Sequence, residues 1–147
     1  MIHIEFATPV DASQNRAWQL LREKAETPER FIPHIRSSEV VERGDDELLR
    51  HITFNDDTTI TERITFFPEH ELVYHFVDHP KFEGEIRNLL FQADESLWLS
   101  IYFQGKTRAG VELGSKDIDQ LRDGFIQTVL AISGQMEEIE RATLETT

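Results

Sequence analysis

The chain has 147 residues, of which 39% are hydrophobic and 29% are charged, a composition typical of a soluble globular protein that forms one domain, residues 1–147. It contains no cysteine, which excludes disulfides, thiolate metal sites and a cysteine nucleophile and is typical of a cytoplasmic protein. The formal net charge of −13 repels phosphates, so we expect neither nucleic acid nor a membrane surface as a partner.

The chain is expected to begin with a β-strand. Ile2, Ile4 and Phe6 alternate with polar or small residues, and Pro9 and Asp11 are expected to end the strand. The opening residues lack the basic and apolar regions of a secretory signal. No run of about 18 apolar residues, the length that spans a membrane, occurs in the chain.

Two short helices are expected to follow this strand. Asp11 or Ser13 can cap a helix over residues 13–24. The pair Thr27-Pro28 then supplies a cap and a first-turn proline for a second short helix that ends near Pro33. The side chains expected to be buried on the first helix are Ala17, Trp18, Leu20, Leu21 and Ala25.

From about residue 35 the apolar pattern changes to a period of two, which predicts six further strands. Short breaks rich in Gly, Asp, Asn and Pro separate them, and short loops join strands that are antiparallel neighbours. With the first strand they make a seven-stranded antiparallel sheet, which must twist and curl. The expected strands are 36–43, 47–54, 58–67, 71–77, 84–93 and 97–104.

After Gly114 the apolar pattern becomes helical, with Ser115 or Asp117 as the cap of one long helix. Its single apolar stripe needs a large apolar surface to cover it, and the curved sheet is the candidate. The fold class is therefore α+β, and a straight helix across a curled sheet leaves space for a core or a pocket. The stripe consists of Ile118, Leu121, Phe125, Val129, Ile132, Met136 and Ile139.

One predicted hairpin places a charged pair on an apolar face. Folding strand 47–54 onto strand 58–67 about Asp56 sets Arg50 opposite Glu62, between apolar pairs. A charged pair on an inward face must be satisfied by its partner, by water or by a ligand. The pair is read either as an ion pair that sets the strand register or as the polar anchor of a cavity.

The next turns add polar groups to the same face. Folding about Glu69 pairs Tyr74 with Ile64, beside Arg50, and a similar register in the following strand adds Asn88. We therefore predict a ligand-binding wall with Arg50, Tyr74 and Asn88 among its polar groups. The complete predicted set is Arg50, Ile52, Phe54, Glu62, Ile64, Tyr74, Phe76, Asn88, Leu90, Phe125 and Val129.

Motifs for common enzyme chemistry do not occur in the chain. There is no HExxH cluster, no GxGxxG or P-loop, and no serine nucleophile elbow, so we predict no metal and no cofactor. The segment from Asp78 to Gly84 is read either as a loop at the mouth of the pocket, with Phe82 as a lid, or as an ordinary surface connection.

Several stretches of the chain carry a resemblance to a known family, namely Trp18, Lys24–Pro28, Phe31–Pro33, Arg50–Phe54, Glu62, and Asn88–Leu90 followed by Leu97 and Leu99. Their order and spacing resemble the AtaL-like (DUF1857) family of the START-like, Bet v 1-like (SRPBCC) helix-grip superfamily. The resemblance covers nearly the whole chain. It implies a sheet wrapped around a long carboxy-terminal helix, with a hydrophobic cavity between them. Members of the superfamily bind lipids, hormones and polyketides or act as cyclases and dehydratases.

Three functions remain open on the sequence. The leading hypothesis is the binding of a small hydrophobic or aromatic, lipid-like or polyketide-like ligand between sheet and helix. The first alternative is an enzyme resembling polyketide cyclases and dehydratases, with Glu62 or Tyr74 as acid/base and Arg50 stabilising an enolate. The second is an interaction module whose cavity has collapsed. The oligomeric state is undetermined, with a homodimer among the options.

Overall fold

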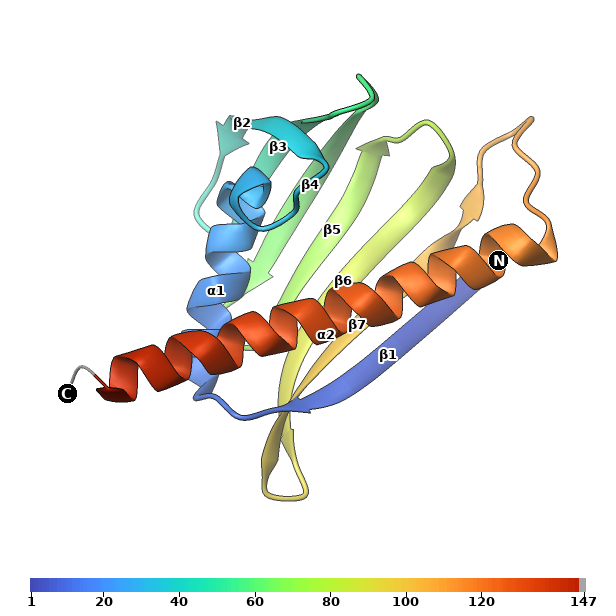
Figure 1. Ribbon diagram of the computed structural model, residues 1–147. Helices are drawn as coiled ribbons and strands as arrows, with labels where there is room; N and C mark the ends of the chain where they lie inside the picture. Colours follow the sequence, from blue (N-terminus) through green and yellow to red (C-terminus); the bar gives the residue numbers. More distant parts are fainter. Residues whose placement is uncertain (146–147) are drawn as a thin grey trace.

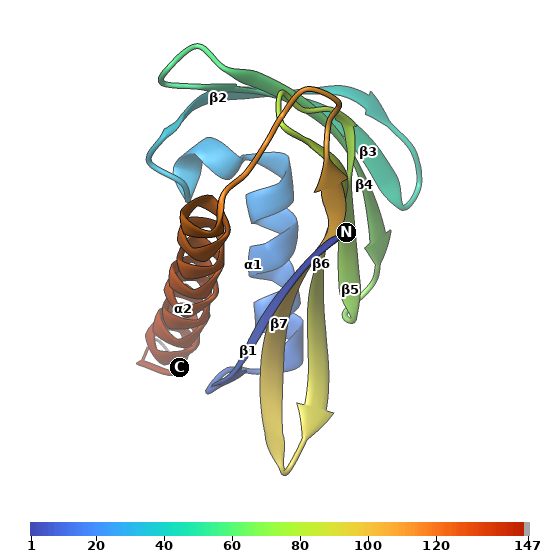
Figure 2. The same cartoon turned by 90° about the vertical axis from the view of Figure 1, so that its right-hand side faces the viewer.

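A long carboxy-terminal helix lies across a curved, seven-stranded antiparallel sheet, with a shorter helix beside it (Figures 1 and 2). The computed structural model describes residues 1–145, so the last two residues of the predicted domain lie outside it. The α+β fold class is confirmed. The elements in chain order are β1 (Ile2–Val10), α1 (Gln14–Glu26), the 3-10 turn η1 (Pro28–Arg30), β2 (Ile35–Arg43), β3 (Glu47–Phe54), β4 (Thr59–Phe67), β5 (Glu71–Asp78), β6 (Phe82–Ala93), β7 (Ser96–Thr107) and α2 (Ser115–Glu145).

The strands lie in the order β1-β7-β6-β5-β4-β3-β2, and every neighbouring pair is antiparallel. Strands β2 to β7 form the predicted meander, and β1 and β2 are the two edges. Strand β1 continues through Pro9 to Val10, although Pro9 was expected to end it. An edge strand can turn the nitrogen of a proline away from its neighbour, so the missing N–H breaks no bond of the ladder.

The region between β1 and β2 contains one α-helix and one short turn. The hydroxyl of Ser13 accepts a hydrogen bond from the backbone N–H of Arg16 at 3.3 Å, which confirms the predicted cap of α1. The second helix is shorter than predicted and is a single 3-10 turn. The N–H of Ile32 still bonds to the carbonyl of Pro28, but Pro33 disfavours a helical conformation in the residue before it.

The predicted hairpin registers are confirmed. Arg50 lies opposite Glu62 in the β3–β4 pair, and Ile64 lies opposite Tyr74 in the β4–β5 pair. Asn88 pairs across from a β5 residue two positions before Tyr74, so its side chain is on the same face of the sheet. The polar residues predicted for one wall therefore share the concave, helix-covered face.

The two halves of α2 differ in how they pack, although the apolar stripe of the helix is continuous in the sequence. Val129, Ile132 and Met136 in the second half are buried in the main core, together with α1 and the sheet. Leu121 and Phe125 in the first half are only half-buried. Within the described residues, no helix is long and apolar enough to cross a membrane.

The last part of the α2 stripe departs from the prediction. Ile139 was expected to be covered by the sheet, but its side chain is 40% exposed. The carboxy-terminal end of α2 extends beyond the sheet, beside the start of α1 (Figure 1).

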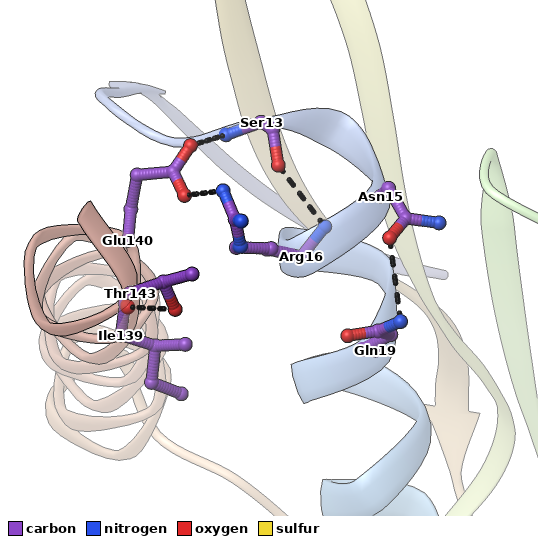
Figure 3. A network of polar contacts seen from close by, with 7 residues as sticks. All are labelled: Ser13, Asn15, Arg16, Gln19, Ile139, Glu140 and Thr143. Atoms are coloured by element: carbon purple, nitrogen blue, oxygen red, sulfur yellow. Dashed lines mark hydrogen bonds and ion pairs between the residues drawn. The ribbon is translucent and has the colours of Figure 1, made fainter. Parts of the chain in front are cut away.

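Acidic residues near the carboxy-terminal end of α2 cap the other helix. Glu140 accepts hydrogen bonds from the backbone N–H of Ser13 at 2.9 Å and from the guanidinium of Arg16 (Figure 3). Glu137 accepts a bond from the backbone N–H of Asp11 at 2.9 Å. Carboxylates are favoured at the positive end of a helix dipole, and here that end belongs to α1.

We predict that Glu140→Ala lowers the free energy of unfolding by about 1–3 kcal/mol, because it removes a part-buried acceptor from the start of α1 and leaves Arg16 unpaired. Urea denaturation measures the change. Glu138→Ala is the matched control, since Glu138 is exposed on the same turn of α2, and its effect should stay within about 0.5 kcal/mol. Equal effects of the two substitutions would contradict this role of Glu140.

Candidate functional site

A cavity of about 410 Å³ lies between the first half of α2 and the concave face of the sheet. Strands β3 to β7 supply one side of it, and the last turn of α1, the segment before β2 and α2 supply the rest. The main core borders it on one side, and a smaller apolar cluster around Ile35, Ile52 and Ile60 borders it on the other. Much of the wall is apolar, with Ile52, Phe54, Ile86, Ile101, Leu121 and Phe125 among its residues.

One position of α2 presents no side chain to the cavity. Gly124 lies on the wall, and a Cβ atom placed there would meet no atom within 4 Å. One turn further on, Thr128 turns its hydroxyl back to the Gly124 carbonyl, at 2.8 Å. A larger side chain at position 124 would be needed to complete the packing of this half of the helix.

Arg50 is held by protein groups on several sides. Its Nε and Nη2 donate to Oε1 of Glu62 at 3.2 and 2.9 Å. Its Nη1 donates to the carbonyls of Lys24 and Ala25 at 3.3 and 2.7 Å. These carbonyls belong to the last turn of α1, which has no N–H donors of its own for them, and a cation is favoured at that end. Four of the five N–H donors of Arg50 are therefore used within the protein.

Lys24 is a second buried cation beside Arg50. Its side chain leaves α1 toward the cavity and is 9% exposed, and its ammonium lies 5.9 Å from the centroid of the Tyr74 ring. Burial, and then the nearby charge of Arg50, lower the pKa of Lys24 from 10.5 to about 8, although Glu62 opposes the change. Within residues 1–145, the ammonium has no hydrogen-bond acceptor and no ion pair.

Tyr74 and Asn88 complete the polar part of the wall. The guanidinium carbon of Arg50 lies 5.0 Å from the centroid of the Tyr74 ring. The ring therefore makes cation–π contacts with both Arg50 and Lys24. Burial raises the pKa of Tyr74 to about 12, so its hydroxyl stays protonated at neutral pH and can donate. Asn88 is 2% exposed, and its carboxamide oxygen has no hydrogen-bond donor within the described residues.

The structure brings most of the predicted site residues to the cavity wall. Arg50, Ile52, Phe54, Glu62, Tyr74, Asn88 and Phe125 lie there. Ile64, Leu90 and Val129 are buried in the main core instead, because α1 and the second half of α2 cover that part of the sheet. Phe76 lies apart as well, with its ring stacked on His79 and near Phe103. The binding role of each residue stays a prediction.

Lys24 is the candidate residue that the sequence reasoning missed. A signal for it exists, because residues 17, 20, 21 and 24 share one face of a helix, and the first three are apolar. A lysine on that face is either buried at a cost or turned toward a polar space. The sequence does not decide between these two outcomes, because the contact between the last turn of α1 and Arg50 is a tertiary contact.

A second hollow of about 550 Å³ adjoins the cavity and shares His34, Phe54 and Ile60 with it. Residues 79–82 line its other side, so this loop lies beside the cavity. Phe82 belongs to β6, and its ring packs edge-on against Phe103 at 5.4 Å. The role of the loop as a mouth stays a prediction. The open space beside Arg50 contradicts the alternative in which the cavity has collapsed.

Comparisons with known proteins agree with this arrangement. A family model described as AtaL, acetylaranotin biosynthesis cluster protein L, matches residues 7–145. A comparison with curated protein sequences found no significant match.

Several solved structures share the fold. The Zhui aromatase/cyclase from Streptomyces sp. R1128 has a TM-score of 0.70 at 18% identity, covering 92% of this chain and 93% of that chain. A START superfamily protein from Mycobacterium smegmatis has a TM-score of 0.72 at 13% identity, covering 93% and 98%. Ara h 8.0201 has a TM-score of 0.69 at 17% identity, covering 92% and 97%. These likenesses confirm the predicted helix-grip fold.

The lowered pKa of Lys24 predicts a rise of stability with pH. Below about pH 8 the lysine is charged in the folded and unfolded states, and its burial costs the folded state roughly 3 kcal/mol. Between its folded pKa of about 8 and its unfolded value of 10.5, the folded state releases the proton and the unfolded state keeps it. The free energy of unfolding should then rise with pH, by about 2 kcal/mol between about pH 7.5 and pH 9.5.

Urea denaturation at the two pH values measures this rise against two variants. Lys24→Met should be more stable than the natural protein at the lower pH and should lack the rise. Lys116→Met is the control and should retain it, since Lys116 is exposed at the start of α2. A natural protein and a Lys24→Met variant with parallel pH profiles would contradict the buried charge.

Proposed function

This chain belongs to the AtaL family, and we propose that it binds a small hydrophobic or aromatic molecule, lipid-like or polyketide-like, in the cavity between its sheet and α2. The observation that carries the proposal is the cavity itself, about 410 Å³ with a largely apolar wall and a few convergent polar groups. Ligand sites in proteins commonly have this size and this composition.

The energetics favour a ligand that has both an apolar body and a polar group. Burying about 200 Å² of apolar ligand surface contributes about 5 kcal/mol, of which the loss of translational and rotational freedom removes at least about 4 kcal/mol. Apolar contact alone therefore yields a weak complex. The polar groups around Lys24 and Tyr74 would supply the remaining affinity and set the orientation of the ligand.

A second candidate function is catalysis on a polyketide-like substrate, as a cyclase or dehydratase. The observation that favours it is the presence of Lys24, Glu62 and Tyr74, three groups that can exchange protons, on the wall of one apolar cavity. Tyr74 would serve as the acid, because its raised pKa keeps it protonated, and Glu62 would serve as the base. Arg50 would stabilise an enolate through the donor that its protein partners leave unused.

Filling the cavity from α2 tests the binding proposal. We expect Gly124→Phe to weaken the binding of the neutral fluorescent probe N-phenyl-1-naphthylamine at least about tenfold, because the new ring occupies space that the probe needs. Fluorescence titration measures the affinity, and native mass spectrometry of the purified protein checks whether a co-purified molecule is lost in the variant.

Gly134→Phe is the matched control. It changes the same residue type on the same helix, also into open space, but Gly134 is not on the cavity wall. This variant should bind the probe as the natural protein does. Unchanged binding in Gly124→Phe, or an equal loss in both variants, would count against a ligand in this cavity.

Glu62→Gln separates binding from catalysis. If the protein converts its ligand, this variant should lose at least about a hundredfold in rate, the contribution typical of a general base, while binding the ligand with similar affinity. The substitution keeps the shape and one acceptor for Arg50. Single-turnover assays with the molecule identified by mass spectrometry measure the rate. Turnover that survives in Glu62→Gln would remove Glu62 from the mechanism.

A further inference from the structure

The charges on the cavity wall do not balance. Among the described residues, the titratable or charged groups on the wall are Lys24 from α1, His34 from the segment before β2, Arg50 from β3, Glu62 from β4 and Tyr74 from β5. Glu62 is the one carboxylate in this set, and Arg50 holds it at 2.9 Å. The ammonium of Lys24 is therefore left without an anion of its own.

The surroundings of Lys24 do not compensate for this charge. Its side chain is more than nine-tenths buried, and no oxygen within residues 1–145 accepts a hydrogen bond from its three N–H groups. The face of the Tyr74 ring is its nearest aromatic contact, which attracts a cation but accepts no conventional hydrogen bond. Buried ammonium groups in proteins are normally paired, so an unpaired one on a cavity wall indicates that the partner comes from outside the chain.

Arg50 cannot take this role as readily. Its guanidinium is already committed to Glu62 and to two carbonyls of the last turn of α1. Its contacts with the described residues leave one N–H donor for a ligand, and an anion that drew Arg50 further would leave those carbonyls and Glu62 without their donors, which is costly for buried groups. Lys24 makes no such contacts, so it can bind an anion without breaking an existing one.

Asn88 is a second polar residue of this wall with an atom that has no partner within residues 1–145. Its carboxamide oxygen is buried and has no donor in the described residues, although Asn88 lines the same cavity. Buried amide oxygens in native proteins nearly always have a hydrogen-bond partner. The Asn88 oxygen needs a donor, which a carboxylate does not supply, so it is Lys24 and not Asn88 that indicates an anion.

We propose that the ligand is a small organic acid with an apolar body, and that its carboxylate pairs with the ammonium of Lys24 inside the cavity. This inference rests on the proposed function, because it names the class of ligand for the same cavity. The ion pair would form at a lysine that is 9% exposed, where a charge-assisted hydrogen bond is stronger than at a fully exposed position. The apolar body would lie along Ile52, Phe54 and Phe125.

Two probes of nearly equal size and shape test the charge requirement. Calorimetric titration at about pH 7 would compare 2-naphthoate with its neutral analogue 2-naphthamide. We expect the acid to bind the natural protein at least about tenfold more tightly than the amide, which is about 1.4 kcal/mol. Lys24→Met should abolish this preference, because it weakens the binding of the acid more than the binding of the amide. Lys116→Met should keep the preference for the acid, because Lys116 is an exposed lysine of α2.

A second measurement uses the natural protein alone. The affinity for 2-naphthoate should fall at least about fivefold between about pH 7.5 and pH 9.5, as Lys24 loses its proton, while that for 2-naphthamide stays constant. Over this range Tyr74, with a pKa raised to about 12, stays protonated. A fall shared by both probes would assign the pH effect to another group and overturn the proposal.

The outcomes separate this inference from the proposed function. Equal binding of acid and amide, or a preference for the acid that survives in Lys24→Met, would overturn the role of Lys24 and leave the cavity as a binding site. No binding of the acid, the amide or N-phenyl-1-naphthylamine would overturn both. Tighter binding of the acid that depends on Lys24 and falls with rising pH would support both.

Discussion

One buried guanidinium connects the parts of this protein that would otherwise be independent. Arg50 extends from β3 to Glu62 on β4 and to the last carbonyls of α1. Its contacts therefore link the two strands of a hairpin and hold the end of a helix against them. Because α1 ends at this point, Lys24 in its last turn is directed into the cavity and not to solvent.

The long helix divides the interior into a packed part and an open part. Its second half is buried against α1 and the sheet, and its last turns hold the start of α1 through Glu137 and Glu140. Its first half spans the cavity with Gly124 and Thr128 in positions where larger residues would fill it. The packed core and the cavity therefore lie along different segments of one helix. The buried charge of Lys24 is a cost to the protein, which a bound anion would offset under the proposed function.

The predictable part of the site is the part that local rules determine. The turns at Asp56 and Glu69 set the strand registers. Because side chains alternate between the two faces of a strand, these registers bring Arg50, Glu62 and Tyr74 to one face. The core positions Ile64, Leu90 and Val129 have the same alternation or helical spacing as residues on the wall. No pattern in the sequence separates a side chain that meets another one from a side chain that meets empty space.

By itself, the sequence determined the fold class, the order of the elements, the hairpin registers and the presence of charged groups on an apolar face, because each depends on neighbours within a few residues or on the strand period. Only the tertiary structure decided which cation is available. Arg50 is satisfied by the end of α1, a segment about 25 residues away, and Lys24 is left facing the cavity. Whether a polar group has a hydrogen-bond partner depends on every element that packs around it. The distances between donors and acceptors on different elements are set only when the chain folds.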